Sequence, residues 1–189
     1  MAARARPAGC PRTTYPGRVD RCDECLFVYS ALDRGALPGR LRDVAGAYPD
    51  ALHGVPDVRR RPAPEVWSPL EYACHVRDVF RVQAERLALA LRVAEPEFTP
   101  MGRDELVVTE RYNAQAPEVV LADLATAADG FAARFAALGE VELARTGVYP
   151  WPRREVRTLL WLGRHTVHEA EHHLLDIRRG AGAPTAGGA

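Results

Sequence analysis

Apolar residues recur at helical spacing in four segments of the chain, with polar residues on the opposite faces. Ser68, Pro69 and Glu71 form a capping box that marks the start of the second segment. Strand patterns are weaker, although the connector at residues 139–153 could hold a short hairpin. The pattern therefore predicts an all-α fold, a four-helix bundle. The expected helices cover about residues 37–52, 69–93, 117–138 and 154–179.

The segments outside the helices divide the chain further. Residues 94–116 form a long connection, which would let the second and third helices lie other than as tight antiparallel neighbours. The leader contains a C-x-x-C motif, Cys22 and Cys25, which is half of a zinc site, a redox pair or a chance spacing. The expected organisation is a flexible leader over residues 1–30, the bundle over 31–179 and a disordered tail over 180–189.

Residues 165–178 of the fourth helix are dense in histidine and carboxylate. Residues four apart lie one above the other on a helix. The stretch therefore offers two pairs of ligands, His168 with His172 and Glu169 with His173. Imidazole and carboxylate bind zinc, nickel or iron, and helix-borne pairs recur in the metal sites of bundles. A polar surface that is rich in histidine by chance is the alternative, and this density makes it the less favoured one.

The apolar stripe of the fourth helix distinguishes the two pairs. Glu169 and His173 border the stripe, whereas His168 and His172 lie nearly opposite its centre and should face solvent or an oligomer partner. We therefore expect Glu169 and His173 to be the metal ligands, with His168 and His172 as the alternative pair. His75 lies at the edge of the buried face of the second helix and is the natural third ligand.

Other polar residues receive weaker assignments. Asp176 could accept a hydrogen bond from an imidazole N–H of a ligand, or it could be a surface charge. Cys74 points about 100° away from the neighbouring His75 on a helix and is expected to be structural. Three arginines could bind a carboxylate of a substrate, or they could belong to a solvated helix face: Arg77, Arg81 and Arg164.

Charge and composition exclude several classes of protein. Lys plus Arg and Asp plus Glu both number 25, so the net charge of zero gives no support for binding to nucleic acid or an anionic membrane. The chain lacks lysine, which excludes Schiff-base chemistry and a P-loop. It also lacks the G-x-S-x-G motif of serine hydrolases. It has no bilayer-spanning apolar run and no signal-peptide core, so we expect a cytoplasmic protein with reduced cysteines.

Two motifs resemble the DinB-like superfamily, which includes mycothiol-dependent maleylpyruvate isomerases and bacillithiol and mycothiol S-transferases. WSPLEYACH, which ends at His75, is similar to the family's Trp followed eight residues later by a His ligand. EAEHHLLDI, which begins at Glu169, is similar to the Glu-x-x-x-His and x-x-Asp-Leu pattern of the maleylpyruvate isomerase branch. The resemblance covers roughly residues 37–178. It implies a bundle with one divalent metal ion, zinc before nickel or iron, on His75, Glu169 and His173.

The same resemblance implies a reaction. A low-molecular-weight thiol such as mycothiol would bind the metal, lose its proton and attack a small electrophile, giving S-transfer or thiol-assisted isomerisation. Two alternatives stay open: a metal-dependent hydrolase on the same site, and a non-catalytic, stress-associated metal-binding bundle. The oligomeric state is also open, with a homodimer among the options.

Overall fold

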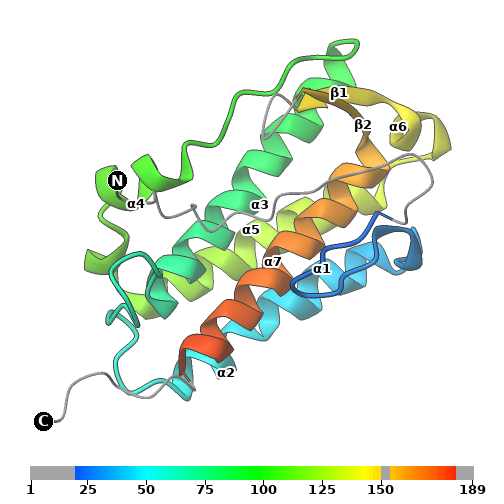
Figure 1. Ribbon diagram of the computed structural model, residues 1–189. Coiled ribbons are helices and arrows are strands. Elements are labelled where there is room, and N and C mark those ends of the chain that lie inside the picture. The colour runs from blue at the N-terminus through cyan, green and yellow to red at the C-terminus, as the bar shows by residue number, and fades with distance from the viewer. Residues whose placement is uncertain (1–19, 150–153, 182–189) are drawn as a thin grey trace, which may run out of the picture.

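The computed structural model describes residues 20–149 and 154–181, and these form a four-helix bundle (Figure 1). One corner of the bundle consists of α1 (Leu37–Gly46) and its continuation α2 (Tyr48–His53). The other three corners are α3 (Pro69–Arg92), α5 (Pro117–Ala136) and α7 (Leu159–Ala181). Both α1 and α3 pack on α5 and on α7, so α1 faces α3 across the core. The predicted all-α bundle is confirmed.

The helices α3 and α5 lie side by side and run in the same direction (Figure 1). The chain must therefore return along the bundle between them, which explains the long connection at residues 93–116. Two short helices, α4 (Arg103–Thr109) and the 3₁₀ helix η2 (Tyr112–Ala114), lie in this connection. Their short length gave no recognisable periodic pattern in the sequence.

The boundaries of the helices follow local chemistry. The predicted capping box is present, because the Ser68 side chain accepts from the Glu71 N–H and the Glu71 carboxylate accepts from the Ser68 N–H. The predicted first helix is divided between α1 and α2, since Pro49 lacks the N–H that would continue α1. Residues 155–158 do not begin α7 but form a strand.

A hairpin is present, but its second strand lies beyond residues 139–153, where we expected it, in residues predicted to begin the fourth helix. The strands β1 (Thr146–Tyr149) and β2 (Glu155–Thr158) pair in antiparallel register, after a short helix α6 (Glu140–Ala144). The hairpin also binds the long connection, because Phe98 N–H donates to the Val148 carbonyl at 2.9 Å. The hairpin and the start of the connection lie together at one end of the bundle, and the connection then runs back to α4 (Figure 1).

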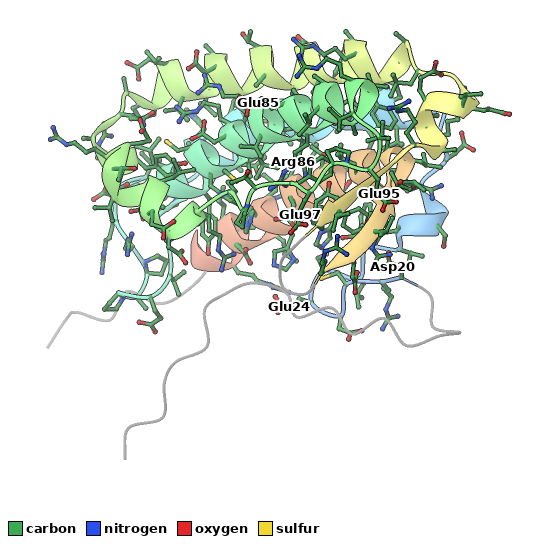
Figure 2. All side chains as sticks on the ribbon, turned by 90° about the horizontal axis from the view of Figure 1, so that it is seen from above. Asp20, Glu24, Glu85, Arg86, Glu95 and Glu97 are labelled. Atoms are coloured by element: carbon green, nitrogen blue, oxygen red, sulfur yellow. The ribbon has the colours of Figure 1, made fainter. Side chains whose placement is uncertain are left out.

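Residues 20–31, which we call the N-terminal segment, lie along α7 on the side away from α3 and α5 (Figure 2). The segment ends in the 3₁₀ helix η1 (Tyr29–Ala31). Asp20 accepts a hydrogen bond from Trp161 Nε1 at 2.8 Å, and the rings of Phe27 and Tyr29 pack on His168. These residues fall in the leader that we predicted to be flexible, and their contacts hold them on the bundle. The rest of the predicted leader, and the tail beyond residue 181, lie outside the described residues.

The core is formed by the apolar stripes of the four helices. Its largest fully buried side chains include Tyr48, Phe80, Phe131 and Leu124. Within the described ranges, no helix combines the length and the apolar character needed to span a bilayer.

Candidate metal centre

Three potential metal ligands meet between α3 and α7. His75 comes from α3, and Glu169 and His173 come from successive turns of α7. Their ligand atoms all lie within 4.8 Å of one another. The structure thus brings together the three residues that the sequence analysis favoured.

His75 is buried and lacks a hydrogen-bond partner among the described residues. Its side chain is 2% exposed, and neither ring nitrogen has a hydrogen-bond partner in the described part of the chain. Burial, and then the charge of His173, lower the pKa of His75 to about 3, so its imidazole is neutral at physiological pH. Buried polar groups are normally hydrogen-bonded. A neutral imidazole with an unused lone pair fits a metal ligand.

His173 is oriented by a carboxylate. Its Nδ1 lies 3.0 Å from Asp176 Oδ2, and an ionised carboxylate can only accept, so Nδ1 carries the proton. The lone pair is then on Nε2, which lies 3.9 Å from Glu169 Oε2 and faces the site. Metal-binding histidines characteristically donate their other N–H in this way. Asp176 therefore occupies the position of the predicted hydrogen-bond acceptor.

Glu169 supplies a negative charge. Burial by itself would raise the pKa of the Glu169 carboxyl, but the neighbouring imidazoles of His165 and His168 hold this pKa well below its usual range. The carboxylate is therefore ionised. The donor set of two imidazoles and one carboxylate is one that catalytic zinc sites use, and it leaves coordination positions open.

The other histidine pair lies on a different face of α7. His168 is 1% exposed and His172 is 8% exposed, so our expectation that they face solvent or an oligomer partner is wrong. The N-terminal segment covers them, and the helical-face argument did not include this segment. Neither residue joins His75; they meet Cys22 and Cys25 instead.

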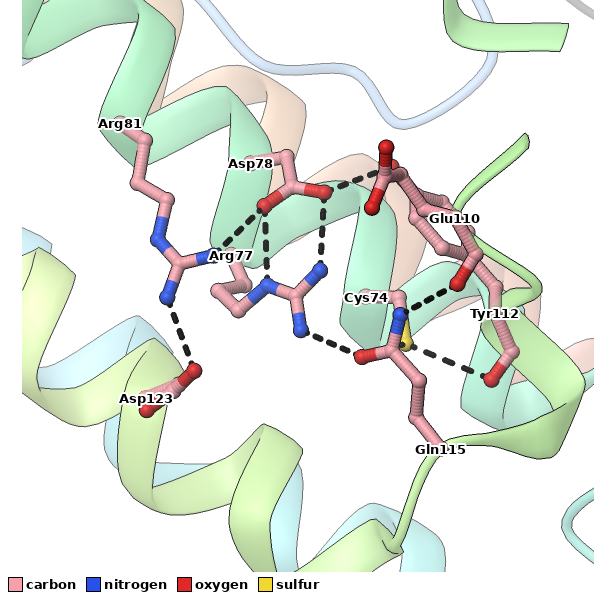
Figure 3. Close-up of polar contacts among 8 residues, drawn as sticks. All are labelled: Cys74, Arg77, Asp78, Arg81, Glu110, Tyr112, Gln115 and Asp123. Atoms are coloured by element: carbon pink, nitrogen blue, oxygen red, sulfur yellow. Dashed lines mark hydrogen bonds and ion pairs between the residues drawn. The ribbon is translucent and has the colours of Figure 1, made fainter. Parts of the chain in front are cut away.

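The three arginines suggested for substrate binding have protein partners. Arg77 pairs with Asp78 through Nε and Nη2, both at 2.9 Å, and Arg81 pairs with Asp78 at 3.1 Å (Figure 3). Arg164 donates to the Leu32 carbonyl at 3.0 Å. The first two belong to a network that ties α3 to α5 and to the connection before it, through Tyr112, Gln115 and Asp123. These contacts favour a structural role for all three.

Cys74 is part of the same region (Figure 3). It is fully buried, and its thiol donates to the Tyr112 carbonyl at 3.8 Å. Burial raises the pKa of Cys74 to about 12, so it stays a thiol. Its surroundings agree with the structural role that we expected.

The surroundings of the metal centre include side chains to which the sequence analysis gave no role at the site. The Trp67 ring contacts the His75 ring with centroids 5.1 Å apart, and the Tyr72 ring stacks on His173 at 5.2 Å. Arg103 from α4 lies over Trp67, with 5.8 Å between its guanidinium carbon and the ring centroid. The long connection brings this cation to the site, and the sequence flagged the connection only by its length.

Arg86 is a second missed cation, on α3 nearer the hairpin end (Figure 2). It donates to the Thr99 carbonyl at 2.7 Å and lies over the rings of Phe98 and Tyr149. Its Nε is buried and has no hydrogen-bond partner among the described residues. One donor of this half-buried guanidinium is therefore without a partner in the described part of the chain.

The comparisons with known proteins agree with the fold. A family model of the DinB superfamily matches residues 40–177, most of the chain. A solved structure, YfiT from Bacillus subtilis, is similar with a TM-score of 0.70 and 19% identity, over 78% of this chain and 85% of that one. YfiT is described as a probable metal-dependent hydrolase with an unusual four-helix bundle topology. No curated protein matches. The chain belongs to the DinB superfamily.

Proposed function

We propose that this protein is a metal-dependent enzyme with one catalytic divalent ion on His75, Glu169 and His173. Zinc is the expected metal, and nickel and iron are the alternatives. The observation that carries the proposal is the buried His75 imidazole, whose two ring nitrogens have no hydrogen-bond partner among the described residues. Glu169 would neutralise part of the charge of the ion, and Asp176 would hold the His173 ring with Nε2 toward it.

We propose further that the co-substrate is a low-molecular-weight thiol, used for S-transfer to a small electrophile or for thiol-assisted isomerisation. A bound ion would supply open coordination positions and would lower the pKa of a thiol that binds there. In S-transfer, a bond from sulfur to carbon forms while the bond from that carbon to a leaving group breaks. The Glu-x-x-x-His pair supports this proposal by its similarity to the maleylpyruvate isomerase branch.

The side chains around the site suit such a substrate. Trp67 and Tyr72 provide aromatic surface beside the ligands. Arg103 is 22% exposed at its side chain, and its ion pair with Asp104 is long, at 3.9 Å. Its guanidinium would bind a carboxylate of the thiol or the electrophile.

The second candidate is hydrolysis at the same site. YfiT is described as a probable hydrolase, and an open metal position can activate water as readily as a thiol. The two reactions differ in whether product formation requires the thiol.

The test is a comparison of turnover with and without thiol. Zinc-loaded protein is given haloalkyl and epoxide model electrophiles with mycothiol, bacillithiol or glutathione, and ester and amide substrates without thiol. We expect thiol-dependent loss of the electrophile, abolished in His75→Ala. The control is Glu171→Gln, which removes a carboxylate of α7 that is paired with Arg40 instead of facing the site. Thiol-independent hydrolysis would replace the S-transfer proposal, and no turnover at full metal content would favour the non-catalytic bundle.

A further inference from the structure

A second cluster of metal-binding side chains lies on the face of α7 that the N-terminal segment covers. Cys22 and Cys25 of the segment meet His168 and His172, and the four ligand atoms all lie within 4.8 Å of one another. Cys22 Sγ is 3.7 Å from His172 Nδ1, and neither cysteine is in a disulfide. Two cysteines and two histidines are a donor set of structural zinc sites.

Both histidine rings are oriented as metal ligands are. His172 turns its Nε2 toward Glu24, at 3.4 Å, and Asp176, at 3.7 Å, and so turns its Nδ1 toward Cys22. His168 turns its Nδ1 toward Glu169, at 3.2 Å, which leaves its Nε2 for the cysteines. Each ring thus has one nitrogen beside a carboxylate and the other in the cluster. A carboxylate in that position fixes the tautomer and strengthens the ligand.

The burial of the cluster also indicates a missing partner. His168 is 1% exposed, and neither of its ring nitrogens makes a hydrogen bond within the described ranges, since the Glu169 contact lacks the geometry. Polar nitrogens that are buried without a hydrogen bond are costly, and coordination to a metal would remove that cost.

We propose that Cys22, Cys25, His168 and His172 bind a second divalent metal ion, with zinc as the expected metal. Four protein ligands fill a tetrahedral shell, so this ion has no open position and is structural. It fastens the N-terminal segment to α7. The chain then carries about two ions, in place of the one expected from the sequence.

The proposed ion has a mechanical role beside the first centre. The segment that it holds places the Tyr29 hydroxyl 3.1 Å from His165 Nδ1 and packs Phe27 on His168. Glu169 lies between the two ligand sets, since one of its oxygens faces His168 and the other faces His173. Loss of the second ion would free the segment and would expose the rear of α7 at Glu169.

The experiment counts zinc by mass spectrometry in the full chain, purified with a reductant and dialysed after loading. We expect about two ions in the wild type, about one in Cys22→Ser/Cys25→Ser, about one in His75→Ala and close to none in the combined variant. Cys74→Ser is the control that removes a buried thiol elsewhere and should keep both ions. If the wild type binds one ion and Cys22→Ser/Cys25→Ser loses it, the result would support this site and refute the centre at His75, Glu169 and His173.

Two further measurements keep the proposal testable if a variant folds poorly. Cobalt bound to the wild type should show thiolate-to-metal charge-transfer absorption, which the ligands His75, Glu169 and His173 cannot produce. Hydrogen exchange should show the Cys22 and Tyr29 amides, which donate to Phe27 and Asp20 carbonyls, exchanging faster after chelation. Wild-type zinc content unchanged in the double cysteine variant, or cobalt without a thiolate band, would overturn the proposal. So would a Cys22–Cys25 disulfide in the protein that holds its full zinc.

Discussion

His75→Leu separates a metal ligand from an ordinary core histidine. In metal-free protein the His75 ring buries a donor and an acceptor with no hydrogen-bond partner in the described chain, and such groups cost about 1–3 kcal/mol. Leucine has a similar volume, and the change in shape costs about 1 kcal/mol. We therefore expect metal-free His75→Leu to be at least as stable as metal-free wild type. In zinc the order should reverse, because an ion at the His75 centre, at 1,000 times its Kd, stabilises the wild type alone by about 4 kcal/mol, whereas an ion at the second cluster would stabilise both proteins equally.

Acid should widen the difference between the metal-free proteins. The pKa of His75 is about 3 in the folded chain and 6.5 in the reference state, so between these values the unfolded chain binds more protons. The wild type therefore loses stability as pH falls below 6.5, by about 1.4 kcal/mol per pH unit from this group alone. At about pH 5 the loss reaches about 2 kcal/mol. His75→Leu lacks this loss, and the contributions of the other histidines cancel in the comparison.

The assay is urea unfolding followed by far-UV circular dichroism, at about pH 7.5 and pH 5, with chelator and with excess zinc. Four conditions for two proteins give the stability differences directly. A metal-free variant that is about 2 kcal/mol less stable than the wild type at pH 7.5 would show that His75 serves packing, and the metal assignment would fail. Equal pH dependence in the two proteins would contradict the neutral, unpaired imidazole.

Other predictions concern packing and ligand orientation. Gly163→Ala should lower the free energy of unfolding by about 1–3 kcal/mol, because the new Cβ would lie 2.4 Å from Phe135 Cζ. Gly130→Ala is the control, because its new Cβ would meet no atom within 4 Å, and it should raise the free energy of unfolding by up to about 1 kcal/mol in the same urea titration. Asp176→Asn should weaken zinc binding about 10- to 100-fold in calorimetric titration, since the amide no longer fixes the proton on His173 Nδ1. Unchanged affinity in that variant would show that Asp176 does not orient a metal ligand.

The bundle and the proximity of His75, Glu169 and His173 could be predicted because each depends on short-range patterns. Helical spacing of apolar residues identified four helices, and the capping box at Ser68 located the start of α3. The face argument works for Glu169 and His173 because the partner of that face is another helix of the bundle. The boundaries of α1 and α7 were less predictable, since a proline and a strand pair decide them.

The second cluster could not be predicted from the same patterns. Cys22 and His172 are 150 positions apart, and the contact between them depends on how a segment without helical periodicity folds back on the bundle. A helical wheel places any residue opposite the core outside the bundle, so it turned His168 toward solvent or an oligomer partner. The C-x-x-C motif and the surplus histidines were both visible in the sequence, but only their proximity in space shows that each could complete the other.

The two ligand sets follow from one property of the α-helix. Neighbouring residues point about 100° apart, so His168 and His172 lie on one face of α7. Glu169 and His173, one position later, lie on the adjacent face. One of these pairs therefore meets His75 of α3, and the other meets Cys22 and Cys25 of the N-terminal segment. This changes how mutants of α7 must be interpreted. Loss of metal in His168→Ala would not exclude Glu169 and His173, because the ion lost could be the structural one. The thiolate band of bound cobalt identifies the ion that remains, because only the second centre has thiolate ligands.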